Sequence, residues 1–118
     1  MSEGNDVGTA NGTPSQGSGN PSDRDLGSVL AELFRVLEAR KRDMPEGSYT
    51  AKLLGGPEDA LLKKVGEEAS EVIMAAKDHD AGHLRYEIGD LVYHLLVVMV
   101  REGMSLEDLA IELAGRRR

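Results

Sequence analysis

Apolar side chains after residue 25 recur every three or four positions, which is the spacing of one face of an α-helix. The first stripe predicts a helix from about residue 26 to Arg42, with Asp23 or Asp25 as its N-cap. Residues 43–50 contain proline and glycine and predict a loop, followed by a short helical or extended piece over 50–54. No stretch alternates apolar and polar residues as a half-buried strand does, so the pattern favours an all-α fold.

Two longer apolar stripes predict helices from Pro57 to about Lys77 and from about Ala81 to Arg101. The second half of the latter, residues 91–100, is apolar on nearly every side, and such a helix must be covered all round. A domain of this size has few other segments that could cover all sides of this helix. We therefore expect this segment to form the main contact between two subunits.

A last short helix is predicted over residues 106–114. Gly103 ends the preceding helix, and Ser105 with Asp108 three residues later forms the pattern of a capping box. Consecutive helices joined by short links usually pack antiparallel. We expect a small antiparallel bundle of four to five helices that is completed by dimerisation.

The composition of the chain changes near residue 25. Residues 1–24 consist mainly of Gly, Ser, Asn, Thr, Pro and Asp, and such a segment cannot bury enough apolar surface to offset the entropy of ordering. We expect a disordered tail over 1–24 and one domain over 25–118. A domain of that length buries only about 60 to 65% of its unfolded surface, which again favours association with a second copy.

Charge and cysteine content exclude several classes of protein. The 118 residues include 14 Lys and Arg and 21 Asp and Glu, which gives a net charge of −7. Because the chain contains no cysteine, it cannot be a disulfide scaffold and cannot have a thiolate zinc site or a cysteine nucleophile. The basic residues are scattered, so we expect neither a nucleic-acid nor a membrane partner. The longest apolar run, 95–100, is far below the roughly 20 residues that cross a bilayer. The N-terminus shows no secretory signal pattern, so a soluble, cytoplasmic protein is expected.

Two pairs of acidic residues are the most informative chemical feature. Glu68 and Glu71 lie about 60° apart on one helix face, and Glu87 and Asp90 repeat that relation on the next helix. Antiparallel packing of these helices would bring four carboxylates together beside the core, where like charges repel one another unless a cation is bound. For either pair taken alone, a solvated helix face is the simpler interpretation.

Oxygen ligands without cysteine favour Mg²⁺, with Mn²⁺ as a substitute, over zinc or copper. Magnesium usually shares its coordination with substrate phosphates, so a phosphate-bearing substrate is expected. Four basic residues near the acidic pairs are candidates for phosphate binding: Lys52, Lys63, Lys64 and Arg85. Lys63 and Lys64 are explained equally well as surface partners of the glutamates four residues later. No P-loop pattern is present, so metal and lysines would hold the phosphates.

Three blocks of the sequence resemble a known family. The blocks are Gly-Ser-Tyr-Thr-Ala-Lys-Leu at 47–53, Lys-Lys-Val-Gly-Glu-Glu-Ala-Ser-Glu at 63–71 and Glu-Ile-Gly-Asp-Leu-Val-Tyr-His-Leu-Leu at 87–96. Their acidic pattern is similar to that of the all-α, MazG-like nucleoside triphosphate pyrophosphohydrolases. The three blocks in this order resemble the phosphoribosyl-ATP pyrophosphatases of histidine biosynthesis, over about residues 26–114.

The resemblance implies a helical homodimer that uses Mg²⁺ to hydrolyse phosphoribosyl-ATP between its α- and β-phosphates, giving phosphoribosyl-AMP and pyrophosphate. By position, it implies that the metal ligands are Glu68, Glu71, Glu87 and Asp90. Glu67 would be a further ligand or would orient the water, and either Glu67 or Glu71 would take the proton of the water. In the first block, Tyr49, Thr50 and Lys52 would lie on the substrate side.

Two other functions stay open from the sequence alone. One is a house-cleaning hydrolase of dUTP, dCTP or another nucleotide, and the other is a non-catalytic helical dimerisation module. His94, beside Tyr93 on an apolar helix, fits a buried, hydrogen-bonded histidine better than a metal ligand. Gly89 lies inside a helix, where glycine costs about 1 kcal/mol relative to alanine, and we expect it to allow close approach of another helix.

Overall fold

The computed structural model describes residues 21–117, and within that range it contains five α-helices and one 3-10 turn. The turn η1 spans Pro21–Arg24, and the helices are α2 (Leu26–Asp43), α3 (Tyr49–Gly55), α4 (Glu58–Lys77), α5 (Ala81–Glu102) and α6 (Leu106–Ala114). The all-α fold is therefore confirmed for the described part of the chain. Of the segment expected to be disordered, residues 1–20 lie outside the described residues, and 21–24 form η1.

Capping residues decide where the helices begin. Asp25 and Asp80 cap α2 and α5 through their side chains, and Ser48 does the same for α3. The reciprocal capping box of Ser105 and Asp108 begins α6. Because these bonds are local, the expected bounds of α2, α5 and α6 are confirmed to within one residue, and so are those of α4, which follows Pro57 without a side-chain cap. The short piece after the loop is helical and forms α3.

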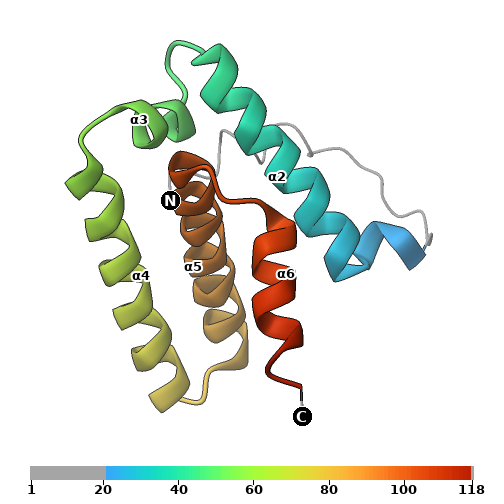
Figure 1. Ribbon diagram of the computed structural model, residues 1–118. Helices are drawn as coiled ribbons and strands as arrows, with labels where there is room; N and C mark the ends of the chain where they lie inside the picture. The colour runs from blue at the N-terminus through green and yellow to red at the C-terminus, as the bar shows by residue number, and fades with distance from the viewer. Residues whose placement is uncertain (1–20, 118) are drawn as a thin grey trace.

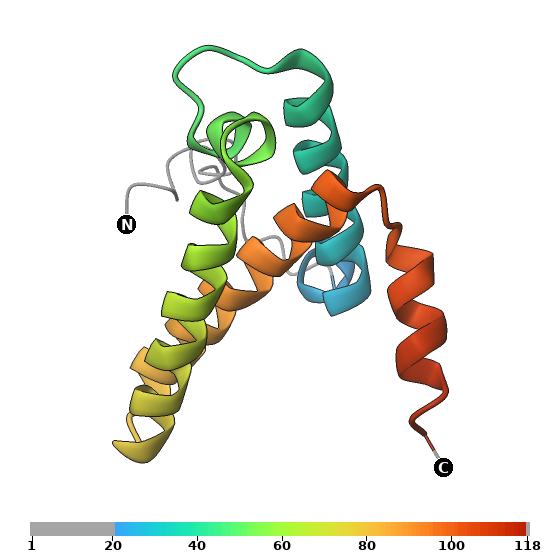
Figure 2. The same ribbon diagram turned by 60° about the vertical axis from the view of Figure 1, so that its left-hand side comes forward.

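The helices α4 and α5 form an antiparallel hairpin, and α2 and α3 cover one end of it (Figure 1). The other end, where α4 ends and α5 begins, extends beyond the rest of the chain (Figure 2). The core lies where the four helices meet, around Phe34, Leu37, Leu61, Leu96 and Val97. The acidic residues of α4 and α5 therefore lie on a hairpin whose position is fixed by this core at one end.

One face of the apolar second half of α5 packs inside the chain, while Val92 and Leu95 on the same segment stay exposed, and its expected role as the main subunit contact stays a prediction. Leu96, Val97, Met99 and Val100 are all buried. The helices α2 and α3 both pack against α5 and supply this cover. The pattern within one helix shows that cover is needed, but it does not show which segment of the chain provides it.

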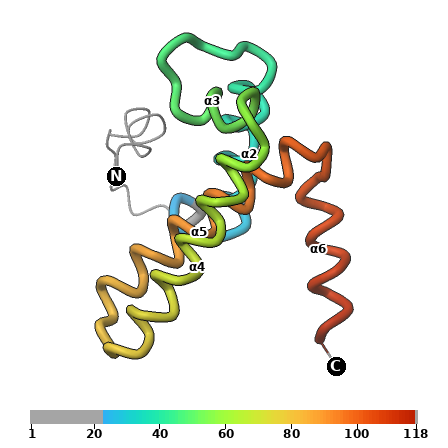
Figure 3. The backbone as a smooth tube through the Cα atoms, turned by 90° about the vertical axis from the view of Figure 1, so that its left-hand side faces the viewer, coloured from blue at the N-terminus to red at the C-terminus, as the bar shows by residue number. Residues whose placement is uncertain are grey.

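Exposed apolar side chains lie on the outer faces of α4, α5 and α6. Ile73 on α4 and Ile88, Val92 and Leu95 on α5 are among the large exposed side chains. The helix α6 stands apart from the hairpin (Figure 3), and its Ile111 is 66% exposed. Among the described residues, no helix combines the length and apolar character needed to span a membrane. These faces are suited to cover by another protein surface.

Candidate active site

Three carboxylates from α4 and α5 converge beside the core. Glu68 lies on α4, Glu87 and Asp90 lie one turn apart on α5, and one oxygen of each lies within 4.8 Å of the others. Glu68 is 5% exposed and Glu87 is 8% exposed. The Oδ2 atom of Asp90 is also buried. The antiparallel hairpin thus brings together three of the four carboxylates that helical spacing placed beside the core.

Glu71 belongs to a second group that overlaps the first. Its carboxylate, a ring nitrogen of His83 and the carboxylate of Glu87 lie within 4.8 Å of one another. His83 Nε2 is 3.0 Å from Glu87 Oε2, which is a hydrogen bond. His83 is not among the site residues predicted from the sequence, although its i,i+4 relation to Glu87 places both on one helix face. Glu87 is shared by the two groups and joins them.

Burial and like charge make Glu68 difficult to ionise. The pKa of Glu68 is raised from 4.5 to about 7, first because burial removes the carboxylate from water. The hydrogen bond with Glu87 and the negative charges of Asp90 and Glu87 raise it further, whereas Lys64 lowers it. The carboxyl of Glu68 therefore keeps its proton to a higher pH than a free glutamate does, and a cation that binds there must displace that proton.

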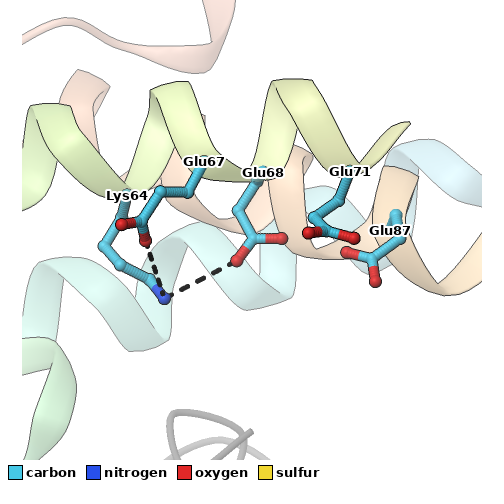
Figure 4. A pocket seen from close by; sticks show the side chains of 5 residues that line it. All are labelled: Lys64, Glu67, Glu68, Glu71 and Glu87. Carbon is cyan, nitrogen blue, oxygen red and sulfur yellow. Dashed lines mark ion pairs between the residues drawn. The ribbon is translucent and has the colours of Figure 1, made fainter. Parts of the chain in front are cut away.

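Lys64 lies next to the acidic group on α4 (Figure 4). Its Nζ is 3.7 Å from Glu68 Oε2 and 3.8 Å from Glu67 Oε1. These three residues, with Glu71 and Glu87, line a pocket of about 330 Å³. One ammonium group and four carboxyl groups make this lining strongly polar, which suits a cation and a phosphate group better than an apolar ligand.

The other residues expected to bind substrate do not line this pocket. Lys52, Lys63 and Arg85 are exposed and lie outside its lining. Thr50 is completely buried, and its hydroxyl is hydrogen-bonded to that of Tyr93. The side chain of Thr50 therefore fastens α3 to α5 in this structure.

Tyr49 also contacts α5 and not the pocket. Its hydroxyl is 3.0 Å from Nε2 of His94, which is completely buried. The Nδ1 atom of His94 is 2.8 Å from the main-chain oxygen of Asp90. The interpretation of His94 as a buried, hydrogen-bonded histidine agrees with this geometry.

The donor set of the site fits a hard divalent cation. Oxygens of Glu68, Glu87 and Asp90 are close enough to bind one ion from two helices, and hard cations prefer such ligands. Three neighbouring carboxylates repel one another when ionised, and a divalent ion would remove that repulsion. Glu71 and His83 extend the donor set on the side of Glu87, and Mn²⁺ accepts nitrogen as well as oxygen.

The chain is similar to one family of known proteins. Residues 30–117 match the model of the phosphoribosyl-ATP pyrophosphohydrolase family. The phosphoribosyl-ATP pyrophosphatase of Haloarcula marismortui is 50% identical over 95 residues, which cover 79% of this chain and 97% of that protein. The one of Halobacterium salinarum is 53% identical over 95 residues, or 78% of this chain and 100% of that protein. A histidine biosynthesis bifunctional protein of Thermus thermophilus is 44% identical over 96 residues, 81% of this chain and 45% of that protein.

Proposed function

The chain belongs to the phosphoribosyl-ATP pyrophosphohydrolase family, and on that premise we propose how its residues perform the reaction. It is a hydrolase that converts phosphoribosyl-ATP to phosphoribosyl-AMP and pyrophosphate in histidine biosynthesis. Because the products are a monophosphate and pyrophosphate, the bond that breaks lies between the α- and β-phosphates. The convergence of Glu68, Glu87 and Asp90, two of which line a pocket together with Lys64, is the observation that supports our assignment of the site.

The proposed cofactor is Mg²⁺, for which Mn²⁺ can substitute, and its proposed ligands are Glu68, Glu71, Glu87 and Asp90. When bound, the ion neutralises charge on the polyphosphate and on the departing pyrophosphate. The proximity of these carboxylates in two overlapping groups supports the assignment. The raised pKa of Glu68, which comes first from burial and then from the hydrogen bond with Glu87 and the nearby negative charges, agrees with this assignment, because a bound cation would favour the ionised carboxylate.

Glu67 is the proposed acceptor of the proton from the attacking water. Its half-exposed side chain lines the pocket one residue before Glu68, so a water between them and the substrate can reach it. Glu71 lies in the group around Glu87, which favours a ligand role for it. Of the two glutamates that the sequence leaves open as the base, Glu67 is therefore preferred. As the water oxygen bonds to a phosphorus atom of the α–β bridge, the bridging P–O bond breaks to give the monophosphate and pyrophosphate, and Glu67 takes the proton.

Lys64 is the proposed contact for the substrate phosphates. It is the basic residue in the lining of the pocket, and its ammonium group already lies within 4 Å of two carboxylates there. A phosphate group would replace Glu67 as its partner and leave that carboxylate free to act on water.

A homodimer is the proposed assembly, and the cytoplasm is the proposed location, where nucleotide substrates of biosynthesis are found. The exposed apolar side chains of α4, α5 and α6 supply a surface for a second copy. Among residues 21–117, a Cβ atom added at Gly66 or Gly89 would meet nothing within 4 Å outside its own helix backbone and chain neighbours. Close approach of a helix within the chain therefore does not explain Gly89, whereas a helix of a second copy would.

Two measurements test this function. Calorimetry with the full chain should detect Mg²⁺ binding that is lost in Asp90→Asn. A substrate panel with pyrophosphate detection should then show turnover of phosphoribosyl-ATP well above that of dUTP and dCTP. Preference for the ordinary nucleotides would favour the house-cleaning activity, and an Asp90→Asn variant with full activity would contradict the proposed site.

A further inference from the structure

A chain of hydrogen bonds links α3 to the turn of α5 that carries Asp90. The Tyr49 hydroxyl is 3.0 Å from His94 Nε2, and His94 Nδ1 is 2.8 Å from the main-chain oxygen of Asp90. A carbonyl oxygen can only accept a hydrogen bond, so Nδ1 of His94 carries the proton. In the neutral ring Nε2 is then an acceptor, and the hydroxyl of Tyr49 donates to it. The direction of each bond in this chain is thereby defined.

The imidazole of His94 has little freedom to turn. Its ring is 0% exposed and packs edge-on between two tyrosine rings, with centroid distances of 6.0 Å to Tyr49 and 5.3 Å to Tyr93. The neighbouring pair, Thr50 and Tyr93, is hydrogen-bonded as well. Two consecutive residues of α3 are thus fastened to two consecutive residues of α5.

The turn of α5 that carries Asp90 is subject to charge repulsion and contains a residue that weakens the helix. The carboxylate of Asp90 lies close to those of Glu68 and Glu87, and like charges push it away from them when no cation is bound. The residue before it is Gly89, and glycine weakens a helix by about 1 kcal/mol relative to alanine. No side chain lies within 4 Å of the position where a Cβ of residue 89 would be, among the described residues.

We infer that Tyr49 and His94 are positioning residues, which hold the Asp90 turn of α5 in the place where its carboxylate meets the other ligands. The inference rests on the proposed function, because it assumes that Asp90 binds the cation. Neither residue touches the ion; both act through the main chain of Asp90. Residues that orient metal ligands typically change affinity by about 10- to 100-fold when they are removed. Because this link passes through the main chain, we expect an effect at the lower end, about tenfold.

Binding of Mn²⁺ to the full chain, without substrate, tests the inference. Tyr49→Phe removes the hydroxyl and keeps the ring. His94→Asn keeps a nitrogen donor near the position of Nδ1 and loses the group that contacts Tyr49. Each variant should weaken Mn²⁺ binding about tenfold. The double variant should be no weaker than the worse single one, because both substitutions remove the same bond. Tyr86→Phe, at an exposed tyrosine of the same helix, is the control and should leave the affinity unchanged.

The possible outcomes separate this inference from the function on which it rests. If the two residues only stabilise the fold, the melting temperature falls while the affinity of the folded protein for Mn²⁺ stays the same, and the inference is wrong. Losses that multiply in the double variant also contradict it. If the unmodified chain binds no Mn²⁺, the proposed metal site fails and the inference fails with it. Normal binding by both the unmodified chain and the variants refutes the positioning role alone.

Discussion

Replacement of Glu68 by glutamine is expected to stabilise the metal-free protein while it destroys the proposed metal site. Glutamine has nearly the shape of the protonated carboxyl and can still form a hydrogen bond with Glu87. It carries no charge, so the cost of ionising a buried carboxyl beside Glu87 and Asp90 disappears. When it is ionised, this side chain thus opposes folding in the absence of metal, which is the cost expected of the ligand role proposed for it.

The size of the expected gain in stability follows from the pKa of Glu68, which rises from a reference value of 4.5 to about 7 in the folded chain. A carboxyl whose pKa is raised on folding favours the folded state below pH 4.5, and this contribution is lost as the pH rises through 7. Each unit of pKa difference corresponds to about 1.4 kcal/mol. At pH 8 the glutamine variant should therefore be more stable by about 3 kcal/mol, and at pH 4.5 the difference should fall below about 0.5 kcal/mol.

Urea denaturation in EDTA, at one protein concentration and at several pH values from 4.5 to 8, measures this difference directly. Glu67→Gln is a matched control, because residue 67 lines the same pocket but its side chain is half exposed. We expect that control to stay within about 0.5 kcal/mol of the unmodified protein. With Mg²⁺ at 100 times its dissociation constant, the unmodified chain should gain about 2.7 kcal/mol, and Glu68→Gln should gain almost nothing.

A glutamine variant that is no more stable than the unmodified chain at pH 8 would refute the expected cost of ionising Glu68. A difference that is the same at every pH would also refute it, because it would have to arise from packing and not from ionisation. A gain in stability with Mg²⁺ in both proteins would show that the ion binds elsewhere.

Three further outcomes are expected. Mg²⁺ affinity measured by calorimetry should rise up to about tenfold per pH unit between pH 5.5 and 7 and level off above pH 7, as the proton on Glu68 is displaced; a flat profile would contradict the ligand role of Glu68. Lys64→Ala should raise KM for phosphoribosyl-ATP about tenfold or more in steady-state assays, whereas Lys63→Ala, outside the pocket, should change it less than twofold; equal effects would remove the distinction between the two lysines. Val92→Asp on the exposed face of α5 should halve the mass measured by light scattering; an unchanged mass would place the subunit contact elsewhere.

Local chemistry in the sequence was sufficient to locate the helices. Apolar residues at helical spacing and side-chain caps such as Asp25 and Ser105 depend on neighbours within one or two turns, so they act alike in any surroundings. The same is true of the acidic pairs, because the angle between Glu68 and Glu71 is fixed by the helix itself. The short link between α4 and α5 then favoured antiparallel packing, which brings the acidic residues of the two helices close together.

Tertiary structure decided everything that depends on which segments meet. The cover of the apolar half of α5 by α2 and α3, the burial of Thr50 and the inclusion of His83 in the second group follow from contacts between residues far apart in the chain or on neighbouring helices. The raised pKa of Glu68 arises in the same way, because burial and the charges of α5 are properties of the packed hairpin. Periodicity determines which face of a helix is apolar, but only packing determines what lies against that face, and the chemistry of the site comes from those contacts.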